Sequence, residues 1–177
     1  PNIAIILNIT PDHLDRHKTF KEYATLKGQI SAFQTDEDIL ILNKDDKNVI
    51  KQGENSKAKI KFFSLQGEIN EGVYLKNDSI AVCFDETKQT LFSVDELHPA
   101  MQWQVENFLA AAAVTSFTNA TPSDIASAAV KFKGLEHRIE WVRTIFGIDF
   151  INDSKGTNVG SINKSLTSFS YPVILIA

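Results

Sequence analysis

Three short polar segments of this sequence contain residue types that carry out chemistry in proteins. The first, residues 8–17 (NITPDHLDRH), directly follows an apolar run. His13 and His17 are four residues apart, a spacing that on a helix makes a two-histidine metal face. No third ligand or glutamate motif accompanies them. The segment is therefore either a binding loop or a solvated polar loop in which an aspartate caps a helix.

The second segment, residues 134–140 (GLEHRIE), contains Arg138. Its guanidinium is a planar fork of donors that suits phosphate or carboxylate. The segment also lies where one predicted structural unit gives way to the next, a frequent place for ligand sites. A salt bridge between the two units explains the same arginine equally well, so both interpretations stay open.

The third segment, residues 152–158 (NDSKGTN), links a predicted strand to a predicted helix. Such loops bind phosphate through the N–H groups at the start of the helix, and Lys155 adds a mobile cation. The usual phosphate-binding patterns, G-x-x-x-x-G-K-S/T and G-x-G-x-x-G, occur nowhere in the sequence. The alternative is a plain turn in which Asp153 or Ser154 caps the following helix.

The elements that position these segments predict an α/β fold. Residues 3–9, 39–42 and 60–63 are apolar runs typical of strands buried on both faces of a parallel sheet. A capping box at Thr19 and Glu22 predicts a helix, with Lys27 beside its core face and pointing to the edge of a cleft. Apolar residues at spacings of three and four form that core face: Tyr23, Leu26, Ile30 and Phe33.

The remaining sequence predicts a small antiparallel sheet and then a second α/β unit. Residues 72–97 contain short strands between turn signals, a meander attached to the main sheet. Helices are expected over residues 104–117 and after residue 121, where Gly134 marks the stop. A hairpin around Gly147, a helix near residues 161–169 and a buried strand over residues 171–177 begin a Rossmann-like unit. We therefore expect one domain over residues 1–136 and the start of another over residues 137–177.

Composition excludes several classes of protein. The 177 residues are 43% hydrophobic with a net charge of −4, which argues against nucleic-acid binding. The longest apolar runs are shorter than the roughly 20 residues of a membrane span. A lone cysteine, Cys83, suits a reducing cytoplasm and is expected to be a small core residue. No methionine precedes the first strand and no polar tail follows the last, so we expect a segment of a longer chain.

Taken in this order, the three polar segments resemble the Mur ligase family of peptidoglycan precursor enzymes. The NITPDHLDRH stretch resembles a motif shared across that family, including the related folylpolyglutamate synthetases. The GLEHRIE stretch followed by INDSKGTN is narrower and is similar to the members that add D-glutamate to UDP-N-acetylmuramoyl-L-alanine. This resemblance covers essentially the whole chain. It implies that residues 1–136 are a central ATP-binding domain without its phosphate-binding loop and that residues 137–177 open an amino-acid-binding domain.

The resemblance implies roles for four residues near the reacting groups. His13 matches the family's Mg²⁺-binding histidine, and Lys27 in TLKG matches a lysine that is carbamylated in the D-glutamate-adding members. Carbamylation converts an ammonium group, whose ordinary pKa is about 10.4, into an anionic oxygen ligand suited to Mg²⁺. Lys155 and Thr157 match catalytic residues near the acyl phosphate and the incoming amino acid.

The resemblance implies a nucleotide site as well. Asn107 in ENFLAA matches the second asparagine of the adenine-contacting helix start, while Arg138 and Asp153 match a nucleotide-contacting arginine and a ribose-contacting aspartate. Residues 101–104 read MQWQ where family members usually read G-x-H-N, so Trp103 and Gln104 replace histidine and asparagine. Gln104 still offers an amide to adenine, through a longer stem.

The implied reaction uses ATP and Mg²⁺ to activate the carboxylate of UDP-N-acetylmuramoyl-L-alanine as an acyl phosphate. The amine of D-glutamate then attacks, giving an amide, ADP and phosphate. A bacterial cytoplasm is implied, with no nucleic acid, membrane or obligate protein partner, and the segment alone is expected to be inactive. The alternatives are another Mur-type or folylpolyglutamate-type amide ligase, a metal-dependent hydrolase using His13 and His17, and a non-catalytic binding module.

Overall fold

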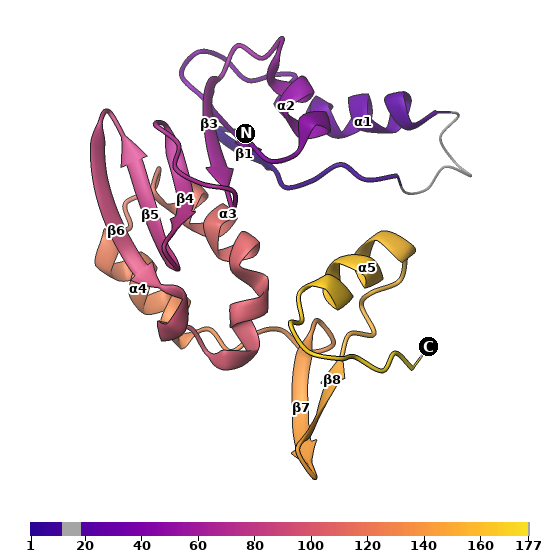
Figure 1. Ribbon diagram of the computed structural model, residues 1–177. Coiled ribbons are helices and arrows are strands. Elements are labelled where there is room, and N and C mark those ends of the chain that lie inside the picture. The colour runs from indigo at the N-terminus through magenta and orange to yellow at the C-terminus, as the bar shows by residue number, and fades with distance from the viewer. Residues whose placement is uncertain (12–18, 177) are drawn as a thin grey trace.

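The computed structural model describes residues 1–11 and 19–176, and its centre is one six-stranded sheet (Figure 1). Strands β1 (Ile3–Ile6), β2 (Ile39–Asn43), β3 (Lys59–Ser64) and β4 (Gly72–Lys76) are parallel neighbours in that order. Strands β5 (Ser79–Phe84) and β6 (Thr87–Ser93) continue the same sheet in the antiparallel direction. The predicted fold class is confirmed, and its parallel and antiparallel parts form one continuous sheet.

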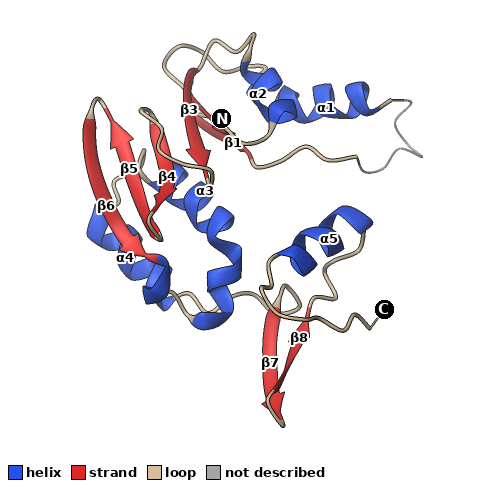
Figure 2. Cartoon of the chain, viewed as in Figure 1, coloured by secondary structure: helices blue, strands red, loops and turns tan. Residues whose placement is uncertain are grey.

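Helices cover both faces of this sheet (Figure 2). On one face, Ala4 and Leu40 pack with Ala24 of α1 (Phe20–Gly28) and Val49 of α2 (Lys47–Gly53). On the other, Ile41 packs with α3 (Val105–Thr115) and α4 (Pro122–Lys131). Successive residues of a strand point to opposite faces, so a strand that is covered on both sides is a continuous apolar run in the sequence.

Side-chain caps fix where the helices begin. Thr19 accepts a hydrogen bond from the N–H of Glu22 at 3.1 Å, which confirms the predicted start of α1. Asp46 caps α2 by accepting from the N–H of Asn48 at 2.8 Å. The second carboxylate oxygen of Asp46 accepts from the N–H of Ile9 at 2.9 Å. One carboxylate therefore ties the start of α2 to the chain that leaves β1.

The exposed face of α1 differs from the prediction. Leu26 is 44% exposed, while Ile30 and Phe33, at 46% and 94% exposed, lie beyond the end of α1 at Gly28. Only the half-buried Tyr23 of the expected core face therefore lies against the core. The predicted helix is confirmed where it begins, but it ends at Gly28, before the last two of the four apolar positions. However, the small side chain of Ala24, 7% exposed, determines which face approaches the sheet.

In the part of the chain that the structure describes, three short 3-10 helices connect the main elements: η1 (Gln29–Ser31), η2 (Val94–Glu96) and η3 (Pro99–Gln104). Because η3 runs directly into α3, Gln104 ends one helix and is the N-cap of the next. Cys83 on β5 is 1% exposed, as expected for a small core residue. Within residues 1–11 and 19–176, none of the helices has the length and apolar character needed to cross a membrane.

A hairpin and one helix follow the sheet. Strands β7 (Glu140–Ile145) and β8 (Ile148–Asn152) pair in antiparallel fashion around Gly147, whose φ is 78°, and α5 (Val159–Thr167) comes next. The predicted hairpin and helix are confirmed, whereas the predicted last strand is wrong, because residues 172–176 are exposed and form no strand. A strand requires a neighbour that pairs with its backbone, and no described strand pairs with this segment. The domain boundary at residue 137 stays a prediction.

Glu68 joins two strands of the meander by pairing with two lysines. Its carboxylate accepts from Lys76 of β4 at 2.8 Å and also pairs with Lys88 of β6. The hydrogen bond from Lys76, and then that from Lys88, lower the pKa of Glu68 from 4.5 to about 2. The folded protein therefore binds this proton more weakly than the unfolded chain does.

This pairing predicts a specific acid sensitivity. The stabilisation is present above pH 4.5, the ordinary pKa, and is lost as pH falls towards about 2. Glu68→Gln should therefore flatten the fall of the melting temperature with pH in that window, by a small amount because the group is exposed. Glu54→Gln, another surface substitution of the same type, is the control; equal flattening by both variants would contradict the assignment.

Candidate functional site

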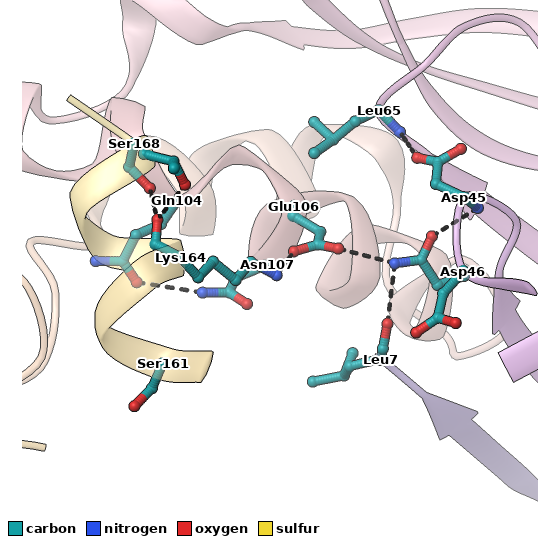
Figure 3. A network of polar contacts seen from close by, with 12 residues as sticks. Leu7, Asp45, Asp46, Leu65, Gln104, Glu106, Asn107, Ser161, Lys164 and Ser168 are labelled. Atoms are coloured by element: carbon teal, nitrogen blue, oxygen red, sulfur yellow. Dashed lines mark hydrogen bonds and ion pairs between the residues drawn. The ribbon is translucent and has the colours of Figure 1, made fainter. Parts of the chain in front are cut away.

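The carboxyl ends of the parallel strands meet at one edge of the sheet, where ligands commonly bind in α/β folds. Asn43 ends β2, and its Nδ2 donates to the carbonyl of Leu7 at 2.9 Å and to Oε1 of Glu106 at 2.8 Å (Figure 3). Asp45 then accepts from the N–H of Leu65, just after β3, at 2.7 Å. One polar network thus joins the ends of three strands to the first turn of α3.

A cavity of about 390 Å³ lies between α3, α4 and the segment that follows α4. Most of its lining is apolar, and it includes Ala111 of α3 and Phe132 and Leu135 beyond α4. The polar side chains in the lining are those of Gln104, Asn107, Thr115 and Arg138. A few polar groups in a largely apolar hollow are typical of a small-molecule site.

The start of α3 presents two amides to this cavity. Nδ2 of Asn107 donates to Oε1 of Gln104 at 3.2 Å (Figure 3). Nε2 of Gln104 also donates to Sδ of Met101 at 3.9 Å. Because each amide has two donor hydrogens and an acceptor oxygen, these two bonds leave further groups to face a ligand. Gln104 therefore reaches the cavity despite its longer stem, and the two amides together offer donors and acceptors.

Unusual backbone geometry presents Arg138 to the same cavity. Its neighbours His137 and Ile139 have φ values of 68° and 47°, in the left-handed region that β-branched residues rarely adopt. Two hydrogen bonds hold these bends: the N–H of His137 donates to Oε2 of Glu140 at 2.8 Å, and the N–H of Ile139 donates to Oδ1 of Asp153 at 3.1 Å. Strained residues of this kind cluster at ligand sites, where the surrounding contacts fix them.

The salt-bridge alternative for Arg138 has no partner in the described chain. The ion pairs among residues 1–11 and 19–176 join other side chains, and none includes Arg138. Arg138 instead lines the cavity, and a guanidinium is a donor fork that suits phosphate or carboxylate.

The loop after β8 holds Asp153 beside the backbone of Arg138. Oδ2 of Asp153 accepts from the hydroxyl of Ser165 on α5 at 2.5 Å, and the N–H of Lys155 donates to the carbonyl of His137 at 3.0 Å. The loop is thus fixed to residues 137–139 on one side and to α5 on the other. These contacts make residues 137–139 and 153–155 neighbours, and Arg138 lines the same cavity as Gln104 and Asn107.

Asn158 caps α5, so the expected cap at Asp153 or Ser154 is wrong, although residues 154–155 do form a turn. Oδ1 of Asn158 accepts from the N–H of Ser161 at 2.8 Å, and the pair forms a capping box. The cap is thus closer to the helix than the sequence predicted. Because Asp153 does not cap the helix, its carboxylate binds the backbone beside Arg138 instead.

The other predicted site residues that the structure describes do not line the cavity. Lys27 is exposed on α1, with Nζ 5.3 Å from the centroid of the Tyr23 ring, and Thr157 is exposed before α5. His13 and His17 lie outside the described residues. Within the described residues, no group of three His, Cys, Asp or Glu side chains is placed to hold a metal ion.

Sequence reasoning missed three residues that support this arrangement. Glu106 is an acidic residue in the first turn of a helix. Such residues are common on the surface, where they interact favourably with the helix dipole, so the sequence gives no sign of a further role. Ser165 and Phe132 carry no local signal, because each acquires its role through a contact distant in the sequence.

Comparison with known proteins identifies the family. Residues 1–115 match the model of the Mur ligase middle domain. The chain belongs to the Mur ligase family. This membership confirms the resemblance and does not favour the metal-dependent hydrolase or the non-catalytic alternative.

Individual relatives in the Mur ligase family match this chain over essentially its whole length. It is 37% identical over 177 residues to UDP-N-acetylmuramoylalanine--D-glutamate ligase from Thermoanaerobacter sp. (strain X514), and 40% identical over 176 residues to the protein of that name from Koribacter versatilis (strain Ellin345). These alignments cover 100% and 99% of this chain but 39% of each relative. The fold matches that of MurF from Acinetobacter baumannii with a TM-score of 0.72, at 20% identity, covering 95% of this chain and 37% of that one.

Proposed function

We propose that the full-length protein is the ATP-dependent ligase that adds D-glutamate to UDP-N-acetylmuramoyl-L-alanine in the synthesis of peptidoglycan precursors. The relatives named for this reaction align with the chain over 99% or more of its length. One structural observation carries the proposal: Gln104, Asn107 and Arg138, from separate segments, line one cavity. These are three of the four residues that the resemblance assigns to the nucleotide.

The adenine base would lie in the cavity against its apolar walls. Asparagine and glutamine side chains pair with adenine because an amide donates to a ring nitrogen and accepts from the exocyclic amine. The amides of Gln104 and Asn107 supply both kinds of group, and Phe132 and Leu135 supply apolar surface. This arrangement supports recognition of the base by hydrogen bonds on one side and by burial on the other.

The sugar and phosphates would lie towards the loop after β8. A ribose hydroxyl donates to a carboxylate, which is the part proposed for Asp153, and Arg138 offers its donor fork to a phosphate. Lys155 would place a positive charge near the transferred group, and the Thr157 hydroxyl would help to orient the incoming amino acid. Because Ile139 and Ser165 already hold the Asp153 carboxylate, its orientation is set before a ligand binds.

Mg²⁺ belongs to the proposal through His13 and Lys27. When bound, the ion offsets the negative charge of phosphate oxygens during transfer. Lys27 is exposed, so its amine is accessible to carbon dioxide, and a carbamate would give it the oxygen ligands that Mg²⁺ requires. The proposed reaction and its nucleotide-linked substrates also place the protein in a bacterial cytoplasm.

Phosphate release by the full-length protein tests the reaction directly. The protein is supplied with UDP-N-acetylmuramoyl-L-alanine, Mg-ATP and one amino acid at a time. We expect release with D-glutamate and none with L-glutamate, D-alanine or a diamino acid. Release with one of the others would move the protein to a different amide ligase of the family, and no release with any of them would contradict the proposal.

Removing the guanidinium tests the nucleotide role of Arg138. We expect Arg138→Ala to raise the apparent KM for ATP about tenfold, or about 1.4 kcal/mol, because a contact to a phosphate is lost. Arg143→Ala, on the exposed strand β7, is the matched control. If Arg138→Ala lowered only the melting temperature, the residue would have a structural role instead.

Filling the cavity tests whether the base binds there. Ala111 is exposed and lines the cavity, so a phenylalanine side chain at this position would occupy the space proposed for adenine. We expect Ala111→Phe to raise the KM for ATP about tenfold or more while leaving the KM for D-glutamate within about twofold. Ser127→Phe, exposed on α4 outside the cavity lining, controls for an added aromatic surface. Normal ATP use by Ala111→Phe would remove the cavity from the mechanism.

A further inference from the structure

A second hollow, larger than the cavity beside α3 and α4, lies between α1 and α2. These two helices lie side by side over one face of the sheet (Figure 1). The hollow has a volume of about 660 Å³, within the usual range of small-molecule sites. Its described lining comes from α1, η1, α2 and the residues just beyond α2, and it shares no described residue with the first cavity. We call this hollow the α1–α2 groove.

The groove gathers positive charge. Lys21, Lys51 and Lys57 line it, and none of the other described lining residues is acidic. The whole chain has 22 acidic against 18 basic residues, so the groove is opposite in charge to the protein overall. Within the described part of the chain, none of the ion pairs includes any of these three lysines. Like charges on one surface repel one another, and a bound anion would relieve that repulsion.

Helix stability does not explain the position of Lys21. Helix α1 begins at Phe20, so Lys21 lies in its first turn, at the positive end of the helix dipole, where a cation is unfavourable. Lys51, in contrast, lies in the last turn of α2, where the dipole alone favours it. An anion beside Lys21 would interact favourably with both the ammonium group and the start of the helix.

Gln34, the most buried polar residue of the described lining, has an acceptor without a donor. It is 4% exposed, and its Nε2 donates to the carbonyls of Pro1 and Ile39 at 3.0 and 2.9 Å. These two bonds fix the amide, because turning it over would place Oε1 against two carbonyl oxygens. Oε1 accepts no hydrogen bond from the described residues. Buried polar atoms are nearly always paired, so this oxygen calls for a donor that those residues do not provide.

We infer that the α1–α2 groove binds a phosphorylated small molecule that carries free hydroxyl groups, such as a sugar phosphate. Phosphate suits the three lysines, because each ammonium group is a compact charge with three donors. A hydroxyl group is the donor that Oε1 of Gln34 lacks, and Phe20 and Ala32 offer apolar surface to a sugar ring. The groove is separate from the cavity proposed for ATP, so this site goes beyond the proposed ligase reaction.

Calorimetric titration of the full-length protein with ribose 5-phosphate, without ATP or Mg²⁺, tests the site. We expect saturable binding by the wild type. The groove variant Lys21→Met/Lys51→Met/Lys57→Met should bind about a hundredfold more weakly, because contacts between ammonium groups and phosphate are lost. No binding by the wild type would overturn the inference.

A second triple variant removes the same total charge from outside the groove. Lys47→Met/Lys59→Met/Lys133→Met changes three exposed lysines that do not line it, and this control should bind within about twofold of the wild type. Equal loss of binding in both triple variants would overturn the inference, because total charge and not the groove would then determine affinity.

Melting temperatures separate lost binding from lost folding. Without ligand, the groove variant should melt at or above the wild-type temperature, because three like charges no longer repel one another. Ribose 5-phosphate should stabilise the wild type and the control variant but not the groove variant. If the groove variant alone melted at a lower temperature without ligand, its lysines would have a structural role and the inference would be overturned.

A change of shape without a change of charge tests the position and the chemistry of the ligand. Ala32→Trp fills part of the groove and should weaken binding about tenfold, whereas Phe33→Trp, at the next exposed position outside the lining, should not. Inorganic phosphate should bind the wild type about tenfold more weakly than ribose 5-phosphate, because it brings no sugar hydroxyl to Gln34. Undiminished binding by Ala32→Trp, or equal affinity for the two ligands, would overturn the inference.

Discussion

The arrangement of this molecule depends on one buried amide at the end of β2. Asn43 is 3% exposed, and an unpaired buried amide costs about 1–3 kcal/mol, so its hydrogens require partners. It donates to the carbonyl of Leu7 after β1 and to Glu106 on α3. The first turn of α3 is therefore positioned by the strand ends of the parallel sheet. The orientation of Gln104 and Asn107 towards the cavity follows from that position.

On the opposite side of the cavity, hydrogen bonds stabilise a strained backbone on both sides of Arg138. The left-handed backbone of His137 and Ile139 costs about 1–3 kcal/mol per residue, and the hydrogen bonds to Glu140 and Asp153 offset that cost. The Asp153 carboxylate therefore makes two contacts: one oxygen accepts from the N–H of Ile139 beside Arg138, and the other accepts from the hydroxyl of Ser165. A carboxylate already bound on two sides has little freedom to rotate, which favours a ligand of one fixed shape.

The sequence predicts much of this fold because several of its signals are local. The N-cap at Thr19, the capping box at Thr121 and the turn at Gly147 determine element ends through neighbours a few residues away. The exposed face of α1 could not be predicted, because a helix with Ala24 on one side and Leu26 on the other satisfies the same period in two orientations. The convergence of Gln104 and Arg138 on one cavity was likewise beyond local signals, and it was the resemblance that placed both at one nucleotide.

A departure from a family motif is best understood together with the residue that it contacts. Trp103 looks disruptive when the segment is compared alone, because an indole replaces an imidazole where hydrogen bonds to a ligand are expected. Its ring lies against Phe169 and Tyr171, which are far away in the sequence. At this position, packing between η3 and the segment after α5 takes the place of polar chemistry. Residue roles transfer between relatives when a side chain meets the ligand by itself, as is proposed for Arg138. They do not transfer when the role belongs to a pair of residues, and only the three-dimensional arrangement reveals the second member.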